Sequence, residues 1–128
     1  MEPFPEDVAR FMQENIETFD QLEILRILGE DADREWDCAV LAGEVQAGTQ
    51  AVRAHVTAMS ARGLLTRIQR GSVLACRYGA ATPELEGKVN RLLHVYKERP
   101  VTMIKMVYQR AKDPLRAFAD AFRIRRED

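Results

Sequence analysis

Hydrophobic residues recur at intervals of three and four along most of this chain, which is the period of one face of an α-helix. The spacing predicts helices over residues 6–16, 19–28, 38–44, 49–62 and 83–98 and one that begins at Pro100. A further helix is predicted after Asp113 and Pro114. The chain is therefore expected to be mainly α-helical.

Residues at the ends of these stretches are typical helix caps. Thr18 and Gln21 have the spacing of a capping box, in which each side chain bonds a backbone amide near the other residue. Other side chains placed to cap a helix, or glycines placed to end one, are Asp37, Thr49, Thr82 with Pro83, Gly29 and Gly63.

The period changes after residue 63. The segments "LLTRI" (64–68) and "SVLACRY" (72–78) are short, rich in β-forming residues and separated by "QRGS", in which Gly71 supplies the turn. They predict a small β-hairpin. The acidic stretch "EDADREWD" (30–37) is expected to be a solvated loop.

Residues 41–65, "LAGEVQAGTQAVRAHVTAMSARGLL", resemble the winged helix-turn-helix DNA-binding superfamily, in the general layout of bacterial transcription regulators of the MarR and ArsR type. The positions in register with the family pattern are Leu41, Ala42, Val52, His55, Val56, Met59, Gly63 and Leu64. The resemblance covers residues 19–78 and implies a recognition helix over about 49–62 and a wing over about 64–78. The expected fold is thus mainly α with a small β-hairpin, a winged helix-turn-helix over 1–80 and a helical extension over 81–128, packed as one compact unit.

Composition agrees with one folded domain. The 128 residues are 46% hydrophobic and 30% charged, which is ordinary for a globular protein. The chain has no apolar run of membrane-spanning length, and its acidic beginning, "MEPFPEDVARF", differs from a signal peptide. We therefore expect a cytoplasmic protein with no membrane association.

The overall net charge of -1 hides an uneven distribution. Residues 1–44 contain 13 acidic and 3 basic residues, residues 45–83 contain 5 arginines and no acid, and residues 84–128 contain 7 acidic and 11 basic residues. A surface without acids favours a polyanionic partner. The middle segment is the candidate for that surface.

Double-stranded DNA is the partner that this segment and the resemblance predict together. Gln50 and Arg53 have side chains able to make bidentate contacts to adenine and guanine. Thr57 shares their helix face, and Thr49 with its neighbouring amides is placed to bind a phosphate. For the wing, the resemblance implies backbone or minor-groove contacts by Arg67, Arg70 and Ser72. The predicted function is sequence-specific DNA binding by a small transcription regulator.

A winged-helix adaptor that binds protein instead of DNA is the alternative, because Arg53 is the only basic residue in the first two turns of the recognition helix. The C-terminal third carries more apolar residues than the domain needs. The resemblance suggests a homodimer through these helices, whereas a surface for another protein or packing within the chain would use the same residues: Met103, Met106, Tyr108, Phe118 and Phe122.

Other residues carry weaker indications. Cys38 and Cys76 follow no metal-binding spacing and are expected in the core, His55 is expected to have a structural role, and His94 has only Glu98 at ligand spacing. Trp36 is expected to pack over the helices, with an exposed anchor for a partner as the alternative. We predict no metal site, no cofactor and no enzymatic activity, because no Gly-rich phosphate loop, nucleophile elbow or paired-acid motif is present.

Overall fold

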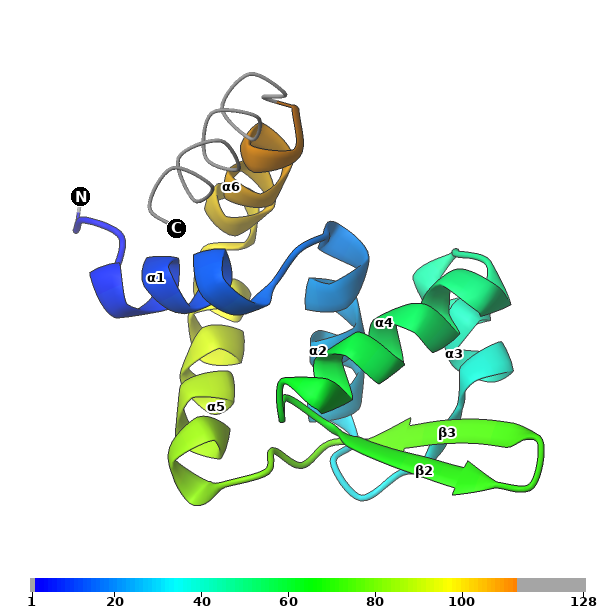
Figure 1. Cartoon of the computed structure of the whole chain (residues 1–128). Coiled ribbons are helices and arrows are strands. Elements are labelled where there is room, and N and C mark those ends of the chain that lie inside the picture. Colours follow the sequence, from blue (N-terminus) through cyan, green and yellow to red (C-terminus); the bar gives the residue numbers. More distant parts are fainter. Residues whose placement is uncertain (1, 113–128) are drawn as a thin grey trace, which may run out of the picture.

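The computed structural model describes residues 2–112 (Figure 1). Within this range the helices are α1 (Glu6–Asn15), α2 (Phe19–Glu30), α3 (Cys38–Val45), α4 (Thr49–Ala61), α5 (Pro83–Glu98) and α6 (Pro100–Lys112). The strands are β1 (Trp36–Asp37), β2 (Thr66–Arg70) and β3 (Val73–Arg77). The predicted mainly α fold with a small β-hairpin is confirmed. None of the helices in the described range is long and apolar enough to cross a bilayer.

Helix α2 is the centre of the hydrophobic core. It packs against α3, α4, α5 and α6, while α1 lies against α5. The five apolar side chains expected to form its buried stripe are all buried: Leu22, Ile24, Leu25, Ile27 and Leu28. Because α2 touches four other helices, it fixes their positions relative to one another.

Three predicted caps are confirmed. The hydroxyl of Thr18 accepts a hydrogen bond from the amide of Gln21 at 3.2 Å, and that of Thr82 accepts one from the amide of Leu85 at 3.1 Å. The carboxylate of Asp37 accepts one from the amide of Ala39 at 2.9 Å. Each cap satisfies an amide that the first turn of a helix leaves without a partner.

Gly29 does not end α2, contrary to the prediction, since the helix continues to Glu30. Its lack of a side chain has a tertiary reason instead. A Cβ atom at this position would lie 2.7 Å from Cδ1 of Leu93 in α5 and 3.4 Å from the ring of Tyr78. Glycine therefore permits the close packing of α5 and the end of the hairpin against α2.

The beginning of α4 also differs from the prediction. Gly48, in an extended conformation, is the capping residue, and Thr49 is already the first residue of the helix. The side chain of Thr49 therefore does not cap the helix that it belongs to. At the other end, Gly63 closes the helix as expected: its φ is 77°, and the amide of Leu64 bonds the carbonyl of Met59 at 3.0 Å.

The acidic stretch before α3 is not entirely a solvated loop. Its last two residues form β1, in which Trp36 pairs with Cys76 and Asp37 with Ala75 of β3. The prediction missed this strand because its pairing partner lies about 40 residues further along the chain. The sheet consequently has three antiparallel strands in the order β1-β3-β2.

The predicted hairpin is confirmed, with strands placed about two residues later than expected for β2. Arg70 pairs with Val73, so the turn consists of Gly71 and Ser72, and Gly71 has a φ of 60°. A two-residue turn with a left-handed glycine matches the twist of the two strands.

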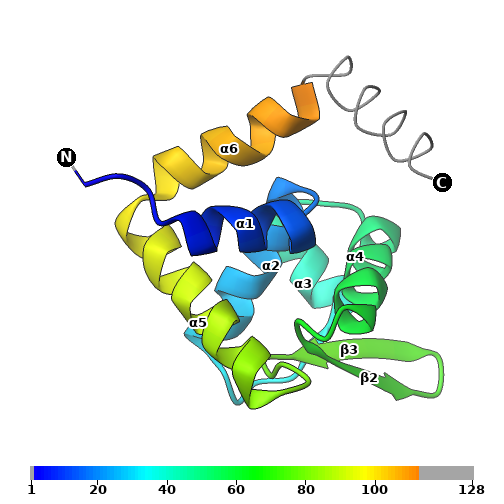
Figure 2. The same cartoon turned by 60° about the vertical axis from the view of Figure 1, so that its left-hand side comes forward.

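Helix α6 lies at the end of the molecule opposite to the hairpin (Figures 1 and 2). Met103 is fully buried, so of the three alternatives for this residue the structure favours packing within the chain, where α6 contacts α2 and α5. Tyr108 is 45% exposed and stacks on Phe19 with ring centroids 5.9 Å apart. Phe118, Phe122 and the helix predicted after Asp113 lie outside the described residues.

Candidate nucleic-acid interface

The surface of α4 that faces away from the core carries the residues predicted to contact DNA. Val52, Val56 and Met59 are fully buried, which turns the opposite side of the helix outward. The exposed residues of its first three turns are small or polar: Thr49, Gln50, Ala51, Ala54, Thr57 and Ala58. Such a helix face is free of bulky groups that would keep it from entering a groove.

The first turn of α4 offers backbone donors. Gly48 has no side chain, and no side-chain hydrogen bond caps this end of the helix within the described residues. The amides of the first turn are therefore directed to solvent, at the end of the helix where its dipole favours a negative group. This arrangement fits the expected phosphate contact near Thr49.

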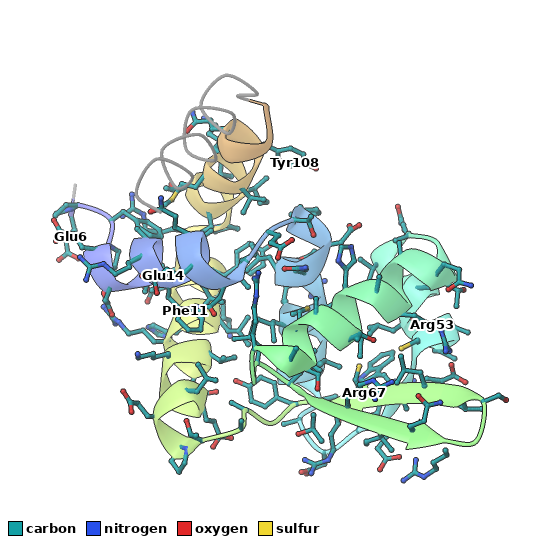
Figure 3. The ribbon with its side chains drawn as sticks, in the orientation of Figure 1. Glu6, Phe11, Glu14, Arg53, Arg67 and Tyr108 are labelled. Carbon is teal, nitrogen blue, oxygen red and sulfur yellow. The ribbon has the colours of Figure 1, made fainter. Side chains whose placement is uncertain are left out.

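Arg53 and Arg67 come from different elements and share one location. Burial raises the pKa of the Cys38 thiol, and the charges of Arg53 and Arg67 both act in the opposite direction on it. The carboxylate of Asp37 also acts on this thiol, in the same direction as burial. Figure 3 places them on the same side of the molecule, along α4 and the neighbouring strand β2.

The hairpin presents its two arginines on opposite faces. Trp36, Cys76 and Arg67 lie directly opposite one another across the three strands, so their side chains share the face toward the core. Arg70 lies three residues after Arg67 and points to the outer face. The two arginines were predicted to act together at the wing, whereas the alternation of side chains along β2 places them on different faces.

Gln69 supports the wing and is not among the residues predicted for the site. Its side-chain amide donates to the carbonyl oxygens of Gly71 and Val73, at 2.9 and 3.2 Å, and its carbonyl accepts from Arg67 at 3.2 Å. Gln69 thus ties the turn to Arg67. Its position two residues after Arg67, on the same face, was the available indication.

The acid-free segment of the sequence does not form an acid-free surface throughout. Arg70 forms an ion pair with Glu35, and Arg62, at the end of α4, forms one with Glu17. Both acids come from the N-terminal third and reach the middle segment only in the folded chain. By contrast, Arg53 and Arg67 have no acidic partner among the described residues.

The acids of α1 are distant from the candidate interface. Figure 3 shows Glu6 and Glu14 on the opposite side of the molecule from Arg53 and Arg67. One acid of this helix is neutralised, because Arg91 of α5 binds the carboxylate of Asp7. The repulsion that α1 would exert on a polyanion beside α4 is therefore small.

Two polar residues of α4 have contacts within the protein. The hydroxyl of Thr57 donates to the carbonyl of Arg53 at 2.9 Å, which leaves the oxygen of Thr57 as an acceptor. His55 is half-buried, and its Nδ1 lies 3.2 Å from the side-chain nitrogen of the buried Gln21. The structural role predicted for His55 is confirmed by this bond between α4 and α2.

The two cysteines are core residues, as predicted. Cys38 and Cys76 are free thiols and are almost fully buried. Burial raises the pKa of the Cys76 thiol to about 12. Trp36 is also buried, at 6% exposure, so it packs within the fold and is not an exposed anchor.

No protein-family model and no curated protein sequence matches this chain. Solved structures do match its fold. The MepR–DNA complex from S. aureus has a TM-score of 0.56 at 12% identity, covering 91% of this chain and 90% of that one. HlyU from Vibrio cholerae has a TM-score of 0.53 at 17% identity, covering 70% and 92%.

A third similar structure comes from Mycobacterium bovis. It is a homodimeric winged helix-turn-helix DNA-binding domain of a possible ArsR-family transcriptional regulator, with a TM-score of 0.52 at 17% identity over 79% of this chain and 94% of that one. At such identities the likeness concerns the fold. The order of α2, α3, α4, β2 and β3 agrees with these similarities. The chain therefore has a winged helix-turn-helix fold.

Proposed function

We propose that this protein is a small transcription regulator that binds double-stranded DNA in a sequence-specific manner. Helix α4 enters the major groove, where Gln50 and Arg53 read base edges and the amides near Thr49 bind a phosphate. The hairpin lies on the flanking backbone and contributes Arg67 and Ser72, whereas the guanidinium of Arg70 is held by Glu35. Thr57 accepts a hydrogen bond from a base amino group, since its own proton is used within the helix.

The meeting of Arg53 and Arg67 is the observation that supports this proposal most. Two cations from separate elements lie on one side of the molecule, next to the exposed face of α4 and without an acidic partner among the described residues. An ion pair within the protein would neutralise the charges of Arg53 and Arg67. Beside a helix with small exposed side chains, the exposed Arg67 and the half-buried Arg53 suit a phosphate backbone, which releases counterions when cations replace them.

Titration of the protein with fluorescently labelled duplex fragments of mixed genomic DNA tests the proposal. We expect an anisotropy increase at low salt, and an affinity that falls about tenfold or more between about 50 and about 200 mM salt because several phosphates are contacted. Absence of binding at the lower salt concentration would contradict the proposal and favour the protein-binding adaptor.

A second copy of this chain is the proposed partner of α6. Val101 is 63% exposed and Tyr108 45% exposed, and the spacing of seven residues places them on one face of the helix. The Mycobacterium bovis domain of similar fold is homodimeric. Pairing through this end would leave both copies of α4 accessible, because the hairpin and α4 do not share it (Figures 1 and 2).

Sedimentation equilibrium at micromolar concentration measures this association. We expect the mass of two chains for the wild type, and a shift toward one chain in a Val101→Glu variant because a charge would be buried at the contact. Lys88→Glu, on an exposed position of α5, is the control for introducing a carboxylate. A wild type with the mass of one chain up to the highest concentration measured would contradict the proposed pairing.

A further inference from the structure

The outer face of the hairpin carries a second basic group that is separate from the Arg53–Arg67 side. Arg70 and Arg77 lie at opposite ends of the hairpin, and both alternate with residues whose side chains point to the core. Both side chains are exposed. Placed beside a duplex, this face would add two cations to the wing.

Glu35 restrains this basic face. It precedes β1, so strand pairing brings its carboxylate to the outer side of the sheet. The two terminal nitrogens of Arg70 bind its two carboxylate oxygens at 2.5 and 3.1 Å, and both side chains remain accessible to solvent. Glu35 also interacts electrostatically with Arg77, and the hydrogen bond from Arg70 holds the pKa of Glu35 below its usual value.

A bidentate pair of this kind uses the same nitrogen atoms that an arginine offers to a phosphate. While Glu35 is bound, Arg70 presents no free fork to DNA, and its charge is cancelled locally. The carboxylate also repels a phosphate that approaches Arg77. Since both partners of the pair are exposed, the pair adds little to the free energy of folding. Its main effect is on the attraction between the wing and an approaching anion.

We propose that Glu35 is an acidic latch that withholds Arg70 from the DNA backbone and thereby lowers the affinity of the wing for DNA. This inference rests on the proposed DNA binding and adds to it a residue that sets its strength. The latch predicts that Arg70 contributes little to binding in the wild type. It further predicts that removing the charge of Glu35 makes Arg70 a contact residue.

A double-mutant cycle tests the latch on the full chain with one labelled duplex. Glu35→Gln is expected to bind about three- to tenfold more tightly than the wild type, with a log–log salt slope steeper by about 0.9, the value for one added phosphate contact. Arg70→Ala alone is expected to change affinity less than about twofold. The double variant Glu35→Gln, Arg70→Ala is expected to lose most of the gain.

Asp33→Asn is the matched control, because Asp33 lies in the same loop, is exposed and has no ion-pair partner among the described residues. It removes the same charge and is expected to change affinity less than about twofold. Circular dichroism melting of each variant checks that its fold is intact.

The outcomes separate the latch from the proposed DNA binding. If the wild type binds DNA and Glu35→Gln binds no more tightly, or if Asp33→Asn gains as much as Glu35→Gln, the latch is overturned while DNA binding stands. If the gain persists in the absence of Arg70, the latch is likewise overturned. If neither the wild type nor Glu35→Gln binds any duplex, DNA binding fails and the latch fails with it.

Discussion

An Arg53→Ala, Arg67→Ala double variant is expected to bind duplex DNA about a hundredfold more weakly than the wild type at about 100 mM salt. Arg53 projects from α4, where a bidentate contact to guanine discriminates between bases, and Arg67 extends the same side of the molecule onto the wing. Losing both removes a base contact and a phosphate contact. Because a phosphate contact is lost, the affinity for DNA should fall less steeply with salt concentration than in the wild type.

The separate contributions can be distinguished by sequence preference. Arg53→Ala should reduce the difference in affinity between a selected target and unrelated DNA, whereas Arg67→Ala should weaken binding to both by a similar factor. Anisotropy titrations with one selected duplex and one scrambled duplex measure both quantities.

A control with the same loss of charge is available on other elements. Arg10 of α1 and Lys97 of α5 are exposed, and the Arg10→Ala, Lys97→Ala variant also removes two positive charges. We expect it to bind DNA within about threefold of the wild type, because α1 and α5 are not part of the proposed interface and distant surface charges are screened by salt. Equal losses in the two double variants would mean that net charge, and not this side of α4 and β2, determines binding.

A Trp36→Ala variant is expected to lose about 3–5 kcal/mol of unfolding free energy. Trp36 is 6% exposed and joins the start of α3 to the sheet by pairing with Cys76 of β3. The guanidinium of Arg34 lies 3.6 Å from the centre of its ring. Truncation would leave a cavity between the sheet and the helices and remove this cation–π contact. Urea unfolding followed by circular dichroism measures the loss.

Trp36→Phe separates the packing of the ring from its polar atom. The indole nitrogen is buried without a hydrogen-bond partner among the described residues, so phenylalanine loses no bond there. We expect a cost of about 1–2 kcal/mol for the smaller ring. Val40→Ala, on an exposed position of α3, should change stability by less than about 0.5 kcal/mol. If Trp36→Ala were as mild as this control, the core role of Trp36 would be wrong.

Helix boundaries could be predicted where the residues that decide them are neighbours in the chain. Thr18, Asp37 and Thr82 each cap an amide two or three residues away, and Gly63 closes α4 through its own backbone conformation. The period of apolar residues likewise identified the buried side of α4. With Gly71 at the turn, these local features were sufficient for the winged-helix layout.

Predictions failed where the reason for a residue lies in another element. Glycine is common at the ends of helices, yet at position 29 it is needed because Leu93 packs against it from α5. The acidic segment that includes Trp36 has the composition of a loop, yet its last two residues pair with β3. Neither contact can be predicted from the neighbouring residues, because the partner residues are about 40 or more positions away in the chain.

Some features of the candidate interface could likewise be predicted from the sequence, and others could not. The residue types on α4 and the lack of acids between residues 45 and 83 were evident from the chain, since composition and helical period need no knowledge of distant contacts. Only the tertiary structure decided that Arg67 shares a side with Arg53 and that Arg70 lies on the other face of the hairpin, held by Glu35. Electrostatic interaction depends on distance through space, and strand pairing and helix packing determine that distance.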